Sequence, residues 1–403
     1  MLSVEEALAR ITAAFQTQPA EWVHLGAAHG RVLAEDLVAA RDQPPQAVSA
    51  MDGYAVRAAD LAGGSAELRL IGQAPAGGRF AGAMGPGETV RIFTGGALPA
   101  GADAIALQEN ARVAGDRVRL EGSVDAGTYV RPAGLDFRKG EVALPTGRRL
   151  TARDLGFAAA LNRAWLPVRR QPRIALLATG DELVMPGEAL AATQIVNSNT
   201  TALAAMVQVW GGLPSDLGVV RDDPAALAAY ADQVVGMDLV VTLGGASVGE
   251  RDLVRSALGE RGLELDFWQI AMRPGKPLMF GTIRGVRLLG LPGNPVSAGV
   301  CAVLFVRAVI CALLGLDPAP PEIPAVLGRA LGPNDRRQEY LRASASWGAD
   351  GRLVAVPAER QDSSMLATFA RADCLIKRAP FAPAMPEGTP VAVLPLLPGP
   401  IGV

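Results

Sequence analysis

The sequence predicts a multidomain α/β protein whose central domain, residues 171–317, holds a doubly wound, mostly parallel β-sheet. Apolar strand-like runs alternate there with helix-like segments, which is the pattern of a parallel sheet with helices on both faces. Short apolar runs between Gly- and Pro-rich turns predict an inserted β-rich module at 44–136 and a C-terminal β-barrel domain at 318–403. An elongated helical and linker region is expected from 1–43 together with 137–170.

The composition of the chain excludes several classes of function. Half of the residues are hydrophobic and the formal net charge is -2 without a basic tail, so large cores are expected and a general nucleic-acid surface is not. The histidines, His24 and His29, show no metal-binding or catalytic pattern, which argues against a zinc site or a Ser-His-Asp triad. Cys301, Cys311 and Cys374 lack metal spacing, and their odd number indicates a reducing, cytoplasmic setting.

Two apolar segments could be mistaken for membrane signals. Residues 1–15 lack the basic start and continuous apolar core of a signal peptide, and Ser3 and Glu6 have capping-box spacing, so we expect a helix there. Residues 299–316 are apolar enough to span a bilayer, but Arg307 near their middle would cost roughly 2.5–3.5 kcal/mol on insertion. We therefore expect a buried helix and no membrane span.

The inserted module and the segment that follows it are expected to differ in structure. Residues 150–170 predict a helix, with Thr151 as N-cap and Asp154 at capping-box distance. Short strands are predicted before it, at 68–73, 88–96, 103–109 and 117–122.

The central domain shows a regular alternation of elements, two of whose helices have Pro at their first position. Asp223 and Asn294 are the expected N-caps in front of these prolines. The predicted strands are 172–180, 215–220, 238–245, 277–283 and 286–293, and the predicted helices are 197–212, 222–234, 250–261 and 294–306. A Pro-rich linker at 316–325 leads to C-terminal strands predicted at 339–347, 352–358, 373–379 and 389–396.

Three Gly- and Pro-rich loops in the central domain predict an anion site. They occupy 242–252, 272–281 and 288–299, and each lies next to an apolar strand. Free backbone N–H groups at such loops and at helix starts favour negative charge, and parallel sheets bind ligands beyond the carboxyl ends of their strands. Neither a Walker A loop nor a GxGxxG motif is present, so the expected ligand is a large phosphorylated molecule outside the nicotinamide class.

Carboxylates near these loops predict a Mg²⁺ site. Glu182, Asp222 and Asp252 follow predicted strands, and Asp52 lies outside the central domain. Magnesium prefers a few carboxylate oxygens together with water and substrate phosphates. Each acid alone could equally begin a loop or cap a helix, and only the set at one sheet edge favours a metal.

Two cations and a helix start supply groups that suit an oxyanion. Arg273 and Lys276 flank a Pro-Gly turn, although exposed charges on a turn are often only solvated. Gly293 permits close backbone approach, Asn294 caps the next helix, and Ser297 presents a hydroxyl in its first turn.

Six motifs in this order and spacing resemble the molybdopterin molybdenumtransferase family (MoeA, also the E-domain of gephyrin-type proteins), and the resemblance covers essentially the whole chain. The motifs are SAMDGYA, RIFTGGALPAGADAI, ATGDEL, GGASVGERD, MRPGKP and LPGNPVS. The resemblance implies that molybdate is inserted into adenylated molybdopterin, with Mg²⁺, to give molybdenum cofactor and AMP. A pyrophosphate-linked substrate fits the predicted anion site, and its cleavage needs charge neutralisation more than a histidine base.

The resemblance also implies roles for individual residues. Catalytic or substrate-facing roles fall on Asp52, Thr94, Asp136, Glu182 and Asp252. The metal ligands would be Glu182, Asp222 and Asp252. Residues that bind molybdate, the nucleotide or the pterin phosphate would be Gly244, Gly245, Ser247, Gly249, Arg273, Lys276, Pro292, Gly293, Asn294, Ser297, Arg342 and Ser363.

The same resemblance implies a homodimer whose active site is shared between subunits. It further implies a molybdopterin adenylyltransferase and downstream cofactor-handling proteins as partners. Four positions depart from the family pattern or vary within it: Gln269 where Lys is frequent, Arg273 where some members have Lys, Ala246 where Val is usual, and Asp362 where some have Gly. Asp362 places an extra carboxylate beside Ser363.

Three other functions remain open at this point. The related α/β domain occurs in molybdopterin adenylyltransferases and CinA-like proteins, but those lack the module that carries SAMDGYA. A scaffold or assembly role, as in gephyrin-type relatives, is disfavoured by the absence of an adapter linker or charged tail. A tungstate-selective enzyme is not separable by motif, because the two oxyanions are nearly the same size.

Overall fold

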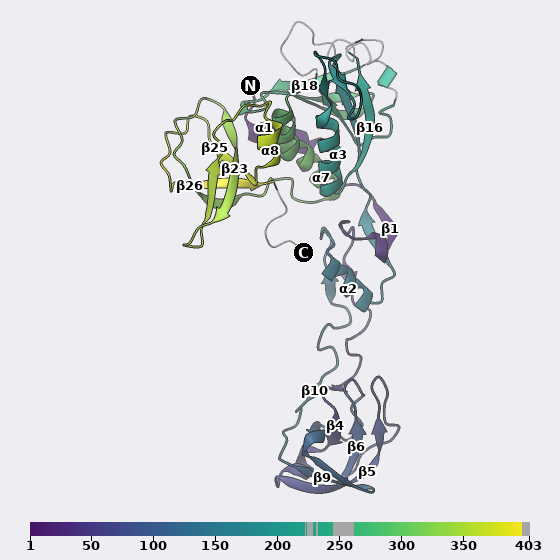
Figure 1. Cartoon of the computed structure of the whole chain (residues 1–403). Helices are drawn as coiled ribbons and strands as arrows, with labels where there is room; N and C mark the ends of the chain where they lie inside the picture. Colours follow the sequence, from purple (N-terminus) through teal and green to yellow (C-terminus); the bar gives the residue numbers. More distant parts are fainter. Residues whose placement is uncertain (222, 224–228, 231–232, 245–261, 397–403) are drawn as a thin grey trace. The chain divides into compact units, whose positions relative to one another are not determined.

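The fold is described from a computed structural model (Figure 1). The structure describes residues 1–221, 223, 229–230, 233–244 and 262–396. The chain forms two compact units. The first comprises Met1–Ala34, Arg149–Ala152 and Trp165–Val403, and the second comprises Glu35–Arg148 and Arg153–Ala164.

The central sheet of the first unit has six strands in the order β16-β13-β17-β21-β20-β18. The first four strands are parallel, whereas β20 and β18 run antiparallel to their neighbours. The bounds are β16 Leu213–Val220, β13 Arg173–Thr179, β17 Leu239–Leu243, β21 Val286–Leu291, β20 Pro277–Ile283 and β18 Glu264–Gln269. The predicted mostly parallel sheet is confirmed. The predicted helices at 222–234 and 250–261, including Asp223 as N-cap, lie largely or wholly outside the described residues.

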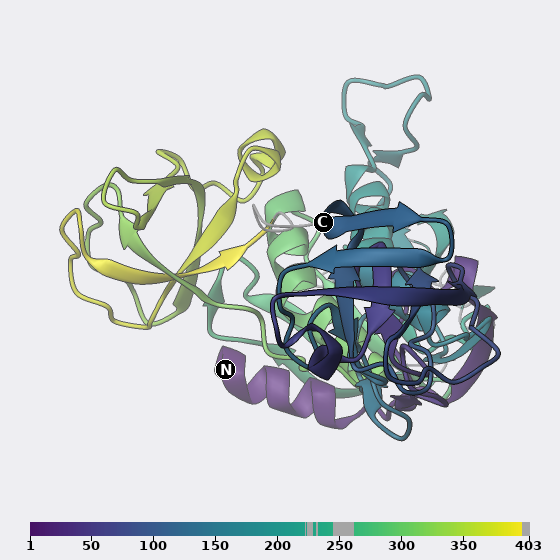
Figure 2. The same ribbon diagram turned by 90° about the horizontal axis from the view of Figure 1, so that it is seen from below.

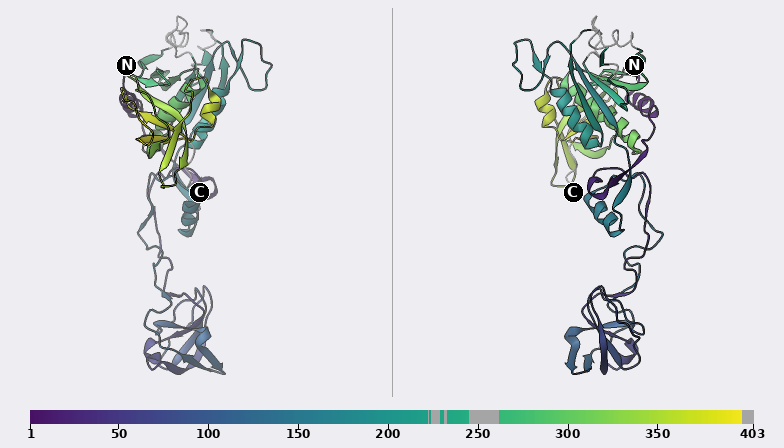
Figure 3. Two further views of the ribbon diagram at one scale, coloured as in Figure 1. Left: turned by 60° about the vertical axis from the view of Figure 1, so that its left-hand side comes forward. Right: turned by 90° about the vertical axis from the view of Figure 1, so that its right-hand side faces the viewer.

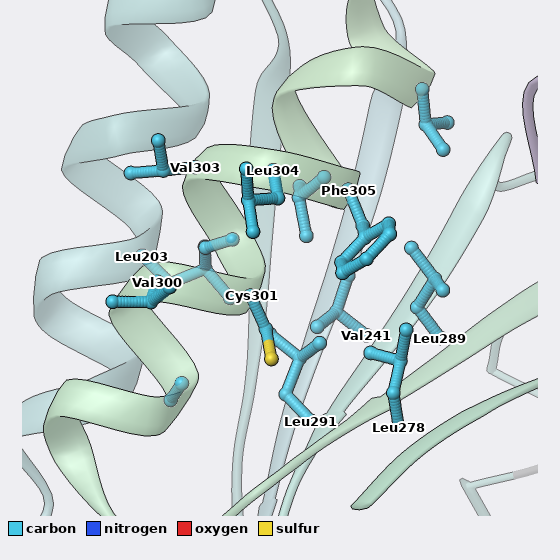
Figure 4. Close-up of a cluster of buried hydrophobic side chains, with 14 of the residues drawn as sticks. Leu203, Val241, Leu278, Leu289, Leu291, Val300, Cys301, Val303, Leu304 and Phe305 are labelled. Atoms are coloured by element: carbon cyan, nitrogen blue, oxygen red, sulfur yellow. The ribbon is translucent and has the colours of Figure 1, made fainter. Parts of the chain in front are cut away.

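Side chains of the buried strands alternate between two separate hydrophobic cores, as the two-residue repeat of a strand requires. Ile174 and Leu176 of β13 belong to the larger core, and Ala175 and Leu177 to the smaller one. Figure 4 shows the larger core, in which strand residues meet the long helix that begins at Pro295. The labelled strand residues are Val241, Leu278, Leu289 and Leu291, and the labelled helix residues are Leu203, Val300, Cys301, Val303, Leu304 and Phe305.

Two long helical segments cover this core, and α1 (Val4–Ala13) adds Val4, Ala7 and Ile11 to it. α3 (Ser198–Trp210) begins at Asn197, whose side chain accepts from Thr200 N, and ends at Gly211 in the left-handed conformation. The second runs through α6 (Pro295–Cys301), a π-helical turn (Ala302–Val306) and α7 (Arg307–Leu314). By length and composition it could cross a membrane, but 83% of its most apolar window is buried inside the protein. The expectation of a buried core helix is confirmed.

The N-terminal segment follows the prediction, whereas the segment before the central domain departs from it. α1 (Val4–Ala13) begins with the predicted capping box of Ser3 and Glu6. β1 (Ala20–His24) pairs with β12 (Trp165–Arg169), so the predicted helix over 150–170 is wrong at its C-terminal end. The helix present is α2 (Ala152–Ala160), and the apolar residues after it form a strand in which Leu166, Pro167 and Val168 are all buried.

The second unit contains the predicted β-rich module, a six-stranded sheet in the order β7-β4-β6-β5-β9-β8 (Figure 2). The bounds are β7 Ala104–Leu107, β4 Gly53–Val56, β6 Glu88–Ile92, β5 Ser65–Ala74, β9 Arg117–Glu121 and β8 Ala111–Ala114. Short pairs flank it: β3 (Val48–Ser49) with β10 (Val130–Arg131), and β2 (Leu37–Val38) with β11 (Val142–Leu144).

The C-terminal strands close into a five-stranded barrel, because β23 pairs with both β24 and β25 (Figure 3). Its strands are β22 Ile323–Leu327, β23 Gln338–Trp347, β24 Leu353–Pro357, β25 Cys374–Arg378 and β26 Pro390–Pro395, with the short helix α8 at Leu366–Ala370. The predicted barrel is confirmed, but β22 begins inside the segment predicted as a linker. β19 (Met272–Arg273) adds to β23 in parallel and attaches the RPGKP turn to the barrel.

Candidate active site

A cleft of about 1100 Å³ lies in the first unit at the carboxyl ends of β13, β17 and β21. Loops after these strands form one side, and the RPGKP turn, Arg337 and the segment 361–366 of the barrel domain complete it. The predicted site residues that line the cleft are Glu182, Gly244, Arg273, Lys276, Pro292, Gly293, Asn294, Ser297 and Ser363. Asp222, Gly245, Ala246, Ser247, Gly249 and Asp252 lie outside the described residues.

Two glycines allow the cleft loops to approach buried structure closely. Gly244 has a φ of +97°, and a Cβ there would lie 2.6 Å from the carbonyl O of Thr179. Gly275 has a φ of +105°, and a Cβ there would lie 2.5 Å from Cys301 Sγ. Only glycine meets both the backbone and the space requirement at these positions.

The two predicted cations of the cleft have different surroundings. Arg273 pairs with Glu339, and its Nη1 lies 3.5 Å from Asp335 Oδ2. Lys276 is partly buried, and it forms no ion pair with any residue that the structure describes. Among the described residues Lys276 is therefore unpaired, whereas Arg273 is held by carboxylates.

A network of charged side chains, of which Glu339 and Arg378 are buried, lies behind Arg273. Arg378 Nη1 donates to Glu339 Oε2 at 2.8 Å, and these two side chains are only 4% and 6% exposed. Arg337, which also lines the cleft, donates to both oxygens of Asp335. These bonds from Arg337, with the charge of Arg273 further away, lower the pKa of Asp335 to about 2. The network connects β19 to the barrel strands and fixes this wall of the cleft.

Asn294 occupies the predicted N-cap position but does not use its side chain as a cap. Its Nδ2 donates to Ser363 Oγ at 2.9 Å. The main chain adds a second bond, because Val296 N donates to Ser363 O at 3.0 Å. The capping function predicted for the Asn294 side chain is wrong, since a contact with the barrel domain replaces it.

Arg342 does not line the cleft, although the sequence resemblance placed it at the oxyanion. Its side chain is fully buried, and Nη2 donates to the carbonyl O of Asp362 at 3.1 Å. Its Nε and Nη1 have no hydrogen-bond partner in the described part of the chain, and burial lowers the pKa of Arg342. Asp362 accepts from Ser364 Oγ at 2.6 Å and Ser364 N at 2.8 Å, and these bonds lower its pKa.

Asp52 and Thr94 lie side by side in the second unit. Asp52 Oδ1 accepts from Thr94 N and from Thr94 Oγ1, each at 2.8 Å. These bonds, together with the charge of Arg91, lower the pKa of Asp52. Asp136 is exposed in the same unit, and its N–H donates to Gln43 O at 2.9 Å.

Sequence reasoning missed three residues that support these groups. Arg337 lines the cleft beside Arg273, and the RRQ sequence before β23 was its only signal. Asn199 Nδ2 donates to Gly293 O at 2.7 Å and holds the PGNP loop. Arg91 stacks over Tyr54 with its Cζ 4.9 Å from the ring centroid and donates to Gly53 O at 3.2 Å, next to Asp52.

Glu182 alone of the predicted metal ligands can be placed, at the end of β13 in the cleft wall. No group of three or more His, Cys, Asp or Glu side chains converges on a metal position within the described ranges. The donor chemistry of the predicted set, carboxylates without thiol or imidazole, fits Mg²⁺.

Comparison with known proteins identifies the family. Three family models match in order along the chain: the MoeA N-terminal region (domain I and II) at 2–162, a probable molybdopterin binding domain at 175–312, and the MoeA C-terminal region (domain IV) at 324–396. The chain belongs to the MoeA family of molybdopterin molybdenumtransferases. The N-terminal match also excludes the adenylyltransferase and CinA-like alternatives, because these were expected to lack that region.

Individual relatives support the same family over most of the chain. Molybdopterin molybdenumtransferase of Haemophilus influenzae is 33% identical over 382 residues, which covers 93% of this chain and 94% of that protein. The Nostoc sp. protein of that name is 38% identical over 74% of this chain and 70% of its own length. The crystal structure of a molybdopterin biosynthesis MoeA protein from Pyrococcus horikoshii matches 99% of this chain and 100% of that one, at a TM-score of 0.86 and 30% identity. The resemblance stated from the motifs is confirmed, and the chain is a transferase of molybdenum cofactor biosynthesis.

Proposed function

We propose that this enzyme binds adenylated molybdopterin and molybdate in the cleft and releases AMP as molybdenum is inserted. The observation that carries the proposal is the cleft itself. It combines Gly- and Pro-rich loops at strand carboxyl ends, an uncommitted Lys276 and the hydroxyls of Ser297 and Ser363. Pockets for ligands of drug size typically measure about 300–1,000 Å³, so a cleft of about 1100 Å³ suits a pterin joined to a nucleotide.

The chain's own groups would stabilise charge during cleavage of the pyrophosphate bond. Lys276 supplies a positive charge that no carboxylate among the described residues neutralises. The start of the long helix places the Ser297 hydroxyl at the same wall, although Pro295 has no N–H and Val296 N already donates to Ser363 O. Preorganised charges of this kind stabilise a developing anion without reorganisation during the reaction.

Mg²⁺ would be held by Glu182, Asp222 and Asp252. When bound, it would neutralise charge on the pyrophosphate oxygens. In this proposal Arg273 and Arg342 support the walls of the cleft and do not bind the substrate themselves. Arg273 does so by pairing with Glu339, and Arg342 by donating hydrogen bonds to the main chain of residues 360–362.

Two further features of the proposal rest on the family resemblance. The enzyme acts as a homodimer, and Asp52, Thr94 and Asp136 of one subunit complete the cleft of the other. It works in the cytoplasm between a molybdopterin adenylyltransferase and proteins that deliver the finished cofactor. The buried, unpaired thiols of Cys301, Cys311 and Cys374 are consistent with a reducing compartment.

Incubation of the protein with adenylated molybdopterin, Mg²⁺ and molybdate tests the proposal. AMP should appear, and the product should reconstitute an apo-molybdoenzyme. A parallel reaction with tungstate separates a tungstate-selective enzyme from a molybdate enzyme. Absence of AMP release with both oxyanions, from folded protein, would refute the proposed activity.

A further inference from the structure

Ser363 is attached to the start of the long helix through both its main chain and its hydroxyl. Its carbonyl O accepts from Val296 N at 3.0 Å, and its Oγ accepts from Asn294 Nδ2 at 2.9 Å. Asn294 and Ser363 are 69 positions apart in the sequence, and both line the cleft. The contact joins the barrel domain to the central domain at the wall proposed for the oxyanion.

The direction of the Asn294–Ser363 hydrogen bond has a chemical consequence. An amide nitrogen carries two hydrogens and accepts no hydrogen bond, so Asn294 Nδ2 can only donate. Ser363 Oγ is therefore the acceptor, and its own proton remains for another group. Within the described residues, no atom accepts a hydrogen bond from Ser363 Oγ.

The neighbouring carboxylate does not take that proton. Asp362 Oδ1 accepts from Ser364 N at 2.8 Å and from Ser364 Oγ at 2.6 Å. Gln361, the residue before Asp362, accepts from Arg342 N and donates to the carbonyl O atoms of Arg342 and Ala358. The segment around Ser363 is thus held by bonds on both sides, while the Ser363 proton stays available in the cleft.

We propose that Asn294 is a positioning residue that makes Ser363 a hydrogen-bond donor to a tetrahedral oxyanion in the cleft. The inference rests on the proposed function, since it assigns how that site recognises molybdate. A fully ionised tetrahedral oxyanion has acceptor atoms only. It binds a hydroxyl that offers its proton, and it is repelled by one that presents lone pairs.

The conformation at Asn294 supports this role over a capping role. Asn is among the best N-cap residues, and Asn294 has the extended backbone of an N-cap, with φ -62° and ψ 127°. The side chain nevertheless forms no cap bond, and Val296 N is satisfied by Ser363 O instead. The amide is therefore used for Ser363 and not for the helix.

The Asn294→Asp variant reverses the polarity at nearly constant shape. A carboxylate can only accept, so Ser363 would donate to it and turn its lone pairs toward the cleft. Asp is an equally good N-cap and is favourable at a helix start, so the thermal midpoint should hold or rise. Molybdate affinity, measured by equilibrium dialysis, should fall by roughly ten- to a hundredfold. KM for adenylated molybdopterin should change less.

The same change in a Ser363→Ala background controls for the added negative charge. If Asn294 acts through Ser363, most of the loss of molybdate affinity disappears in that background. Equal losses in both backgrounds, or a clear fall in the thermal midpoint of Asn294→Asp, would overturn the proposal.

Asn294→Ala repeats the test without a new charge. We expect a smaller loss of molybdate affinity with Ser363 present and none with Ala at 363. A loss that is independent of residue 363 contradicts the inference even if the Asp variant folds poorly. If the unmodified enzyme releases AMP but shows no coupling, only this inference is wrong. If it neither binds molybdate nor releases AMP, the proposed function is wrong.

Discussion

Replacement of Lys276 by Met tests whether the uncommitted cation of the cleft acts on the substrate. Met keeps most of the length of the unbranched side chain and removes the ammonium group with its charge and hydrogen-bond donors. A charge-assisted hydrogen bond contributes about 1.5–3 kcal/mol, so kcat/KM for AMP release should fall by roughly ten- to a hundredfold. No ion pair within the described residues is lost, so the free energy of unfolding should change by less than about 0.5 kcal/mol.

Arg273→Met is the matched control for Lys276→Met. It removes a cation three positions away that is already paired with Glu339 and lies near Asp335. Arg273 is 44% exposed and Glu339 keeps Arg378, so we expect about 1 kcal/mol of destabilisation and a smaller loss of kcat/KM. AMP release and thermal denaturation are measured on both variants. If Lys276→Met keeps kcat/KM within about twofold of the unmodified enzyme, or if only Arg273→Met loses activity without losing stability, the distinction between the two cations is wrong.

Two further predictions follow from other parts of the structure, and a third follows from the shared site that the family resemblance implies. Gly244→Ala should lower the free energy of unfolding by roughly 1–3 kcal/mol, because its Cβ would lie 2.6 Å from Thr179 O. Gly236 also has a positive φ, +87°, but open space around it, so Gly236→Ala should lower that free energy by less. Equal losses of stability in the two variants would refute the close approach at Gly244. Asp335 has a lowered pKa of about 2, so its pairing with Arg337 stabilises the fold above about pH 4 and is lost as the pH falls toward 2. In Arg337→Gln, acid denaturation monitored by circular dichroism should show a shallower loss of stability across that window, and an unchanged slope would contradict the pairing. Mixed dimers of Asp52→Ala and Asp252→Ala chains should recover part of the AMP release that each lacks alone, and proven mixed dimers without recovery would argue against a shared site.

The sequence predicted the elements whose signals are local. The apolar runs of the parallel strands and the Ser3–Glu6 capping box each arise from neighbouring residues, and both predictions were confirmed. β22 was missed because Pro324 reads as a linker residue. At Pro324, β22 pairs only with β26, because β24 joins β22 only at Val326 and Leu327. The N–H that Pro324 lacks would therefore face an unpaired edge, where its absence is tolerated.

For the candidate site, too, the sequence predicted what depends on neighbouring residues and missed what depends on distant contacts. The sequence named several residues that line the cleft, since glycines, prolines and cations at strand ends are typical of anion-binding loops. It did not reveal that Arg342 is fully buried, or that Asn294 turns from its own helix to Ser363. Both facts depend on contacts between residues far apart in the sequence, which no local pattern records.

The two walls of the cleft use those interdomain contacts for different purposes. At the RPGKP turn, Arg273 pairs with Glu339, which also binds the buried Arg378. Arg273, which could otherwise bind the substrate, therefore holds β19 against β23. At the helix start, the amide of Asn294 gives up a cap bond to hold Ser363. In each case one polar group anchors the barrel domain. A neighbour in the cleft, the Lys276 ammonium or the Ser363 hydroxyl proton, then has no partner among the residues that the structure describes. The division implies that loss of an anchor should lower affinity through the geometry of its neighbour. Loss of the neighbour should lower affinity directly and leave the fold intact.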